Sequence, residues 1–240
     1  GALPRKPGVV YDRKNSSVTR IQMEEIPQEI YSSTRLFHTS GISLAVGEQT
    51  RKVVMEMIRR FKESGAVVSF DVNYRANLWG EKEARETIER ILPYVDILFV
   101  SEESSRRMFA KTGEMSEIMK GYCKDFGISV VATTQRTVIN PHNHSFTSII
   151  YSAETDRFYT QAPYTNIELV DRIGSGDAYV AGVLSALLDS GDYQQAVEFG
   201  NAASAVKNTI PGDAPASDRA ELERLIQAHK STGMQSEMDR

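Results

Sequence analysis

The sequence has one cysteine, Cys123, among its 240 residues. A single cysteine cannot form an internal disulfide, and it cannot supply the cysteine pair of a typical zinc site. The residues around Cys123 indicate a helix in which it is a small buried residue rather than a reactive thiol. We therefore expect a reducing, cytoplasmic setting.

Long apolar runs and an excess of basic charge are also missing. No apolar run approaches the ~20 residues that cross a bilayer, and residues 1–8 lack the apolar core of a secretory signal. The chain has 28 basic against 32 acidic residues, a net charge of −4. Nothing in it forms the basic stripe that nucleic-acid binding requires. We expect neither membrane nor nucleic acid as a partner, and the 40% hydrophobic composition is that of an ordinary globular protein.

The apolar residues predict helices that alternate with strands. Residues 36–39 predict a strand that enters a turn at 40–42, and apolar runs predict buried strands over 67–72, 97–100 and 128–133. Apolar residues at helical spacing predict helices over 46–64, 81–91, 102–111, 116–126, 177–189, 193–208 and 217–229. Residues 145–151 and 158–162 predict an antiparallel pair. This order predicts an α/β fold: an open, mainly parallel sheet with helices on both faces.

The two ends of the chain differ from this pattern. Residues 9–20 are β-rich with a polar centre and predict an edge hairpin, a small β lid segment. A doubly wound fold normally opens with a strand and a glycine turn, whereas this sequence opens in loop-like residues. We therefore expect one domain over 1–230 that lacks the N-terminal part of the fold. Residues 231–240 are expected to form a disordered tail.

The strongest functional signal is the sequence VDRIGSGD at 170–177, directly before an apolar helix. Gly174 and Gly176 let the backbone approach a ligand closely. A helix N-terminus presents N–H groups and the positive end of the helix dipole, which suits a phosphoryl group. Asp177 can accept a proton there. Taken alone, the motif also fits a turn with a helix-capping aspartate, but it is neither a dinucleotide fingerprint nor a P-loop.

The string DRIGSGDAYVAGVLSAL resembles the C-terminal signature of the ribokinase-like (phosphofructokinase B-type) carbohydrate kinases. Four further stretches are similar to the kinases of 2-keto-3-deoxygluconate within that family: YDRKNS at 11–16, Gly41-Ile42, DVNYR at 71–75 with Leu78-Trp79, and NTIPGD at 208–213. The resemblance runs in order along nearly the whole chain. It implies a phosphotransferase that uses ATP and Mg²⁺ and acts on the terminal hydroxyl of a keto-deoxy sugar acid.

The resemblance also implies roles for individual residues. Asp177 corresponds to the base that activates the sugar hydroxyl, and Gly174, Ser175 and Gly176 correspond to the anion hole. The implied substrate contacts are Tyr11, Arg13, Ile42, Arg75 and Asp213, and the implied nucleotide contacts are Asn73, Tyr74, Arg75, Thr133, Arg136 and Asn201. The planar guanidinium of arginine suits a substrate carboxylate. No ligand set for a metal is implied, and a homo-oligomer is compatible because family members often pair through their lid strands.

One stretch departs from the family pattern. Where the family usually has Asn-x-x-Glu, linked to Mg²⁺ and phosphate, this chain has Ser101-Glu102-Glu103-Ser104. Glu102 or Glu103 can substitute only through water. Two alternatives therefore stay open: a kinase for another sugar such as fructose, and an inactive relative that only binds sugar or nucleotide. Arg13 and Arg75 favour an anionic substrate, and the retained 174–177 turn favours an active kinase.

The two histidines of the sequence His142-Asn143-His144 have a spacing that can bind a metal. They lie in a polar stretch without further acidic or cysteine ligands. The sequence therefore predicts a solvated loop rather than a metal site.

Overall fold

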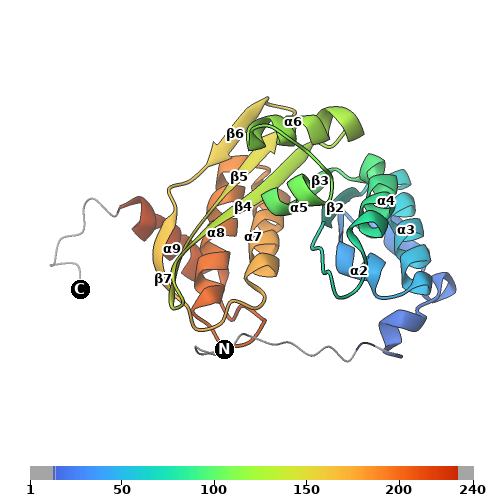
Figure 1. The fold of residues 1–240 in the computed structure, drawn as a ribbon, viewed down its shortest axis with the longest axis horizontal. Helices are drawn as coiled ribbons and strands as arrows, with labels where there is room; N and C mark the ends of the chain where they lie inside the picture. Colours follow the sequence, from blue (N-terminus) through green and yellow to red (C-terminus); the bar gives the residue numbers. More distant parts are fainter. Residues whose placement is uncertain (1–12, 14, 232–240) are drawn as a thin grey trace. The chain divides into compact units, whose positions relative to one another are not determined.

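The computed structural model describes residue 13 and residues 15–231. The chain divides into two compact units, Gly1–Val95 and Asp96–Arg240, which are coloured from blue to green and from green to red in Figure 1. Each unit is described by itself. Both combine parallel strands with helices, as the alternating sequence pattern predicts.

The first unit contains two parallel strands, β1 (Leu36–Ser40) and β2 (Val67–Asp71), in which Leu36 lies opposite Val67. The connection runs through α2 (Gly41–Ala45) and α3 (Glu48–Glu63). α3 forms because Val53, Val54, Ile58 and Phe61 recur at helical spacing, and these side chains are buried. The unit also contains α1 (Glu29–Ser33), α4 (Glu81–Ile91) and 3₁₀ turns at Ser17–Arg20, Met23–Glu25 and Leu92–Tyr94.

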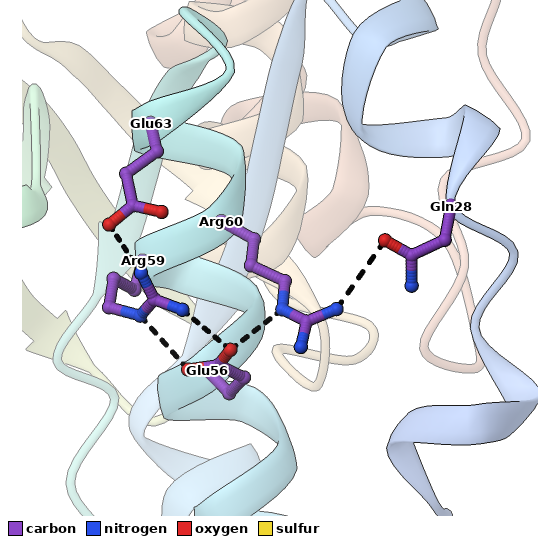
Figure 2. A network of polar contacts seen from close by, with 5 residues as sticks. All are labelled: Gln28, Glu56, Arg59, Arg60 and Glu63. Carbon is purple, nitrogen blue, oxygen red and sulfur yellow. Dashed lines mark hydrogen bonds and ion pairs between the residues drawn. The ribbon is translucent and has the colours of Figure 1, made fainter.

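Glu56 organises the polar surface of α3 (Figure 2). Its Oε1 lies 2.7 Å from Nη2 of Arg59 and 2.7 Å from Nε of Arg60. Arg59 also pairs with Glu63, and Nη1 of Arg60 reaches Oε1 of Gln28 at 3.5 Å. The hydrogen bonds from Arg59 and Arg60 lower the pKa of Glu56 to about 2. The carboxylate thus stays charged at neutral pH, and the network links α3 to the segment before α1.

The second unit contains a mixed sheet. β3 (Ile97–Phe99) and β4 (Val130–Asn140) pair in parallel, and β4 pairs antiparallel with β5 (Asn143–Ser152). β5 in turn pairs antiparallel with β6 (Arg157–Thr160) and β7 (Tyr164–Glu168). The helices are α5 (Glu102–Arg107), α6 (Met115–Phe126), α7 (Ser175–Ser190), α8 (Tyr193–Asn208) and α9 (Arg219–Lys230).

Alternate residues of β5 face different helices. The Phe146 ring lies 5.9 Å from the ring of Tyr179 on α7, and Ser148 Oγ donates to Oδ1 of Asn201 on α8 at 2.7 Å. Tyr151 belongs to the other face, where Nζ of Lys120 on α6 lies 5.6 Å from its ring centroid. Because side chains alternate along a strand, α7 and α8 cover one face of β5 and α6 covers the other.

Two glycines let α7 and α8 lie side by side (Figure 1). A Cβ at Gly182 on α7 would lie 2.6 Å from the carbonyl oxygen of Phe199, and a Cβ at Gly200 on α8 would lie 2.6 Å from Cγ2 of Val183. A side chain at 182 would force the two backbones apart, and one at 200 would displace the side chains of Val183 and Tyr179. This contact fixes α7 and therefore the location of its N-terminus.

The structure confirms most of the predicted elements. α4 has the predicted bounds, the antiparallel pair of β5 and β6 is present, and the three C-terminal helices lie where the sequence places them. The strand predicted over 128–133 continues to Asn140. The prediction is too short because the outer half of β4 is exposed and does not form a continuous apolar run. None of the helices in the described part of the chain is long and apolar enough to cross a membrane.

Two local predictions are wrong. Ser17–Arg20 is a 3₁₀ turn rather than part of an edge hairpin, while residues 9–12 and 14 lie outside the described residues. His144 is in β5 and only 5% exposed, so the solvated-loop interpretation fails for it. Alternate side chains of a strand point to the same face, and His144 shares its buried face with Phe146 and Ser148. This position in the strand explains the error. Of the tail predicted over 231–240, Ser231 caps α9, and residues 232–240 lie outside the described residues.

We predict that Gly182→Ala destabilises the protein by about 1–3 kcal/mol, because the added methyl group would collide with backbone atoms of α8. The measurement is the free energy of unfolding from urea denaturation. Gly121→Ala on α6 is the matched control, since a Cβ there meets nothing within 4 Å. The control should be neutral or slightly stabilising because alanine favours helix. Equal effects of the two substitutions would contradict the packing argument.

Candidate functional site

The turn that leads into α7 has the geometry of an anion site. Gly174 precedes the helix with φ +79°, and its carbonyl oxygen accepts the hydrogen bond from Ala178 N at 2.8 Å that starts the helix. The first N–H groups of a helix have no partner within the helix and point outward with the positive end of its dipole. Asp177 lies exposed in this first turn. A carboxylate and a set of N–H donors therefore occupy the same helix end.

A second loop, at 208–213, packs against this turn. The carboxylate of Asp171 accepts from Ile173 N at 3.0 Å and from Gly212 N at 3.2 Å. These two bonds, the one from Ile173 first, lower the pKa of Asp171. A Cβ at Gly174 would lie only 1.9 Å from the carbonyl oxygen of Asp213. Glycine is required at 174 by space as well as by its positive φ.

The backbone adds to the same contact. The N–H groups of Val170 and Asp171 both donate to the carbonyl oxygen of Asn208, at 2.9 and 3.2 Å. The 208–213 stretch, which the sequence singles out, thus lies against the glycine turn. Asp213, an expected substrate contact, has an exposed side chain beside it.

Two arginines give the region its positive charge. Arg136 lies opposite Phe146 in the register, in the exposed outer half of β4. Arg172 lies in the glycine turn itself. Burial, followed by the nearby positive charge of Arg172, lowers the pKa of Arg136. Neither guanidinium has an ion pair with any residue that the structure describes, so the two positive charges are not neutralised there.

His144 lies beside these arginines. It is two residues from Phe146 on the same face of β5, and its Nδ1 is buried without a hydrogen-bond partner among the described residues. Burial and the charges of Arg136 and Arg172 lower its pKa, so the ring is neutral at pH 7. A buried polar atom next to two uncompensated cations indicates a place where a ligand supplies the missing acceptor or donor. The combination fits an anion with several oxygen atoms.

Sequence reasoning identified Arg136 but not Arg172 or His144 as members of this cluster. Arg172 lies in the glycine motif, between Asp171 and Gly174, but the motif itself assigns it no role. His144 could have been found from the period-2 burial of β5. The proximity of His144 to Arg136 and Arg172 could not have been found from the sequence, because it depends on which end of β5 lies near α7.

The structure separates two other expected nucleotide contacts from this cluster. Asn201 is fully buried, and its amide accepts from Ser148 and donates to Gln161 Oε1 at 3.1 Å. Its polar atoms therefore hold α8 to the strands. Thr133 is 2% exposed and lies three residues from Arg136, so it points to the opposite face of β4. Its Oγ1 has no partner in the described part of the chain.

The expected residues of the first unit lie around the end of β2. A Cβ at Gly41 would be 2.1 Å from the carbonyl oxygen of Val72, so the first turn of α2, which includes Ile42, lies against the segment that follows β2. Asn73 has a positive φ of 35° and donates its N–H to Asp71 Oδ1 at 3.1 Å. The hydroxyl of Tyr74 donates to the carbonyl oxygen of Trp79 at 3.1 Å.

Two expected substrate contacts are arginines of this unit. Arg75 is exposed, with Nη1 3.0 Å from the carbonyl oxygen of Tyr74. Arg13 is half-buried, and its carbonyl oxygen accepts from the hydroxyl of Ser16. Tyr11 lies outside the described residues, so its predicted position on one face with Arg13 remains a prediction.

The stretch that departs from the family pattern caps a helix. Ser101 Oγ accepts from Ser104 N at 3.0 Å at the start of α5. Glu102 and Glu103 pair with Arg106 and Arg107 one turn later, at 2.7 and 2.6 Å. No group of three or more acidic, histidine or cysteine residues that could hold a metal is present among the described residues.

Comparison with known proteins matches residues 6–219 to a family model described as pfkB family carbohydrate kinase. Over 226 residues the chain is 30% identical to 2-dehydro-3-deoxygalactonokinase of Haloferax volcanii, which covers 94% of this chain and 68% of the relative. It is 27% identical over 215 residues to 2-dehydro-3-deoxygluconokinase of Bacillus subtilis, with 86% and 60% covered. The crystal structure of 2-dehydro-3-deoxygluconokinase from Thermotoga maritima superposes with a TM-score of 0.88 at 29% identity, over 95% of this chain and 70% of that one.

We predict that Arg172→Ala raises the dissociation constant for ATP roughly tenfold or more, because a hydrogen bond to a charged group contributes ~1.5–3 kcal/mol. Arg136→Ala should act in the same direction. The measurement is titration calorimetry on the full-length protein. Arg157→Ala on the exposed strand β6 is the matched control and should leave the constant unchanged. An unchanged constant in Arg172→Ala would exclude this arginine from the anion site.

Proposed function

Because the chain belongs to the pfkB family of carbohydrate kinases, we propose that the full protein transfers the terminal phosphoryl group of ATP to a 2-keto-3-deoxy sugar acid. The acceptor is the terminal hydroxyl of 2-keto-3-deoxygluconate or of the galactonate epimer. The observation that carries the proposal is the glycine turn before α7, where Asp177 and the two unpaired arginines, Arg136 and Arg172, belong to one region. The chain spans 68% and 60% of the lengths of the two curated relatives named above.

The described residues fit the polyphosphate of a nucleotide. The first turn of α7 offers N–H groups, and Arg136 and Arg172 offer guanidinium donors that no acidic residue in the described chain occupies. Such donors stabilise charge that spreads over phosphoryl oxygens during transfer. Magnesium usually binds through phosphates and water with one or two carboxylates, so the nucleotide would bring the ion to this site.

Asp177 is the residue that we assign as general base. It is exposed in the first turn of α7, directly after the glycines that hold the phosphoryl-binding N–H groups. The acceptor hydroxyl attacks the terminal phosphorus of ATP and passes its proton to the carboxylate as the new O–P bond forms, while the bond to the bridging oxygen breaks and ADP leaves with that oxygen. The helix end therefore serves both the acceptor hydroxyl and the transferred group.

A carboxylate on the substrate explains the arginines of the first unit. Arg75 is exposed and makes a local bond to a backbone carbonyl, which leaves other guanidinium N–H groups available for a ligand. Arg13 belongs to the sequence YDR that resembles the sugar-acid kinases. The relatives from Haloferax volcanii and Bacillus subtilis are named for two such acids. These observations favour an acid over fructose, although a fructokinase from Arabidopsis thaliana is also similar, at 26% identity.

We predict that Asp177→Asn lowers kcat by about 10²–10⁴-fold, because the amide keeps the shape of the side chain but cannot accept the proton. The measurement is steady-state turnover of the full-length protein with ATP and the sugar acid. Asp189→Asn, on the exposed last turn of the same helix, is the control and should retain turnover. Near-normal turnover by Asp177→Asn would rule out this residue as the base.

We predict that kcat/KM for 2-keto-3-deoxygluconate or the galactonate epimer exceeds that for fructose at least about tenfold, because a bidentate arginine–carboxylate contact contributes ~1.5–3 kcal/mol. Arg13→Ala should raise KM for the acid and change that for fructose little, while Arg20→Ala in the following turn serves as control. If fructose is the better substrate, or if Arg13→Ala raises KM equally for fructose and the acid, the assignment of a sugar acid as substrate is wrong and only the kinase class stands.

A further inference from the structure

Lys207 is a fully buried lysine, with 0% of its surface exposed, near the end of α8. Burying an ammonium group is costly unless its N–H bonds find acceptors. Nζ of Lys207 donates to the carbonyl oxygen of Ile210 at 2.9 Å and to that of Asp171 at 3.2 Å. Neither acceptor is a carboxylate, so the side chain is not part of an ordinary salt bridge. Its charge instead joins two backbone segments.

These two segments are the ones that form the phosphoryl-binding turn. Asp171 begins the stretch that leads to Gly174, and Ile210 belongs to the loop whose Asp213 backbone lies against Gly174. The carboxylate of Asp171 crosses the same gap by accepting from Gly212 N. The charge of Lys207 also contributes to the lowered pKa of Asp171. The two opposite charges thus join the loops from two sides.

We propose that Lys207 is a positioning residue that holds the Gly174–Asp177 turn in shape by bridging the carbonyl oxygens of Asp171 and Ile210. The inference rests on the proposed kinase function for its catalytic consequence, but the bridge itself is a property of the chain. A shift of the turn would move the N–H groups and Asp177 together. Misplacement of a catalytic group by about 1 Å can lower the rate by about a hundredfold.

The first test uses hydrogen exchange and does not depend on activity. Lys207→Met replaces the ammonium with an apolar group of similar length. We expect faster amide exchange in a peptide that covers 170–177, with unchanged exchange in α6, because the loss is local to the two loops. Lys124→Met, at an exposed position in the last turn of α6, is the matched control. Unchanged exchange at 170–177 in Lys207→Met would overturn the proposal.

The second test measures catalysis and its rescue. Lys207→Ala should lower kcat of the full-length protein roughly tenfold to a hundredfold with little change in KM for the sugar. Ammonium ions should restore part of kcat in this variant, because they can bind the two carbonyl oxygens that the side chain leaves. They should not stimulate the wild type or Lys124→Ala. A kcat equal to wild type, or a loss of kcat that ammonium does not relieve, would contradict the assignment.

Lys207→Gln keeps the test decisive if the Met and Ala variants do not fold, because it retains an N–H donor toward the two carbonyl oxygens. Its amide is shorter than the lysine side chain and carries no charge, so exchange at 170–177 should still increase and kcat should still fall. Unchanged exchange and kcat in this variant would overturn the proposal. A wild-type protein without kinase activity, combined with the expected change in exchange, would refute the proposed function and leave the bridge in place.

Discussion

The contact between the Gly174 backbone and the Asp213 carbonyl oxygen is the constraint on which the site depends. No side chain fits at 174, since its Cβ would lie 1.9 Å from that oxygen. The loop after α8 can therefore support the turn before α7 directly, backbone against backbone. The glycine pair at 182 and 200 has the same effect further along, where α7 and α8 touch. The helix end is held at two points, so its N–H groups and Asp177 keep a fixed orientation without a ligand.

Charge has a different distribution in the site than in the whole chain. The chain carries a net charge of −4. Burial, followed by the nearby charge of Arg172, nevertheless lowers the pKa of Arg136, and no acidic residue in the described chain pairs with either arginine. Two cations held near each other and near a helix N-terminus are unfavourable without an anion. The positive charges of Arg136 and Arg172 are therefore available to bind an anionic ligand. The neutral His144 beside them adds no further positive charge.

The sequence predicts secondary structure and local chemical motifs better than it predicts which distant residues lie close together. Periodicity predicts α4 and the three C-terminal helices. Of these, α8 is buried over most of its surface rather than on one face. The GSGD motif predicts the helix-end site because glycine and aspartate have specific local roles there. By contrast, Arg172, His144 and Lys207 gain their importance from register and loop contact, which no local pattern encodes. The exposed outer half of β4 was missed for a related reason: its strand conformation depends on pairing with β5 rather than on its own apolar residues.

The electrostatic balance of the supporting loops explains why a buried lysine is useful there. Asp171 uses its carboxylate oxygens to accept N–H groups of Ile173 and Gly212, which shapes the turn but places a negative charge beside a site for anions. Lys207 offsets that charge without competing for the same oxygens, because its own hydrogen bonds go to backbone carbonyls. A neutral residue at 207 would leave the negative charge of Asp171 unbalanced. The charge of the buried lysine therefore lets a carboxylate shape the turn while Arg136, Arg172 and the helix dipole still attract an anion.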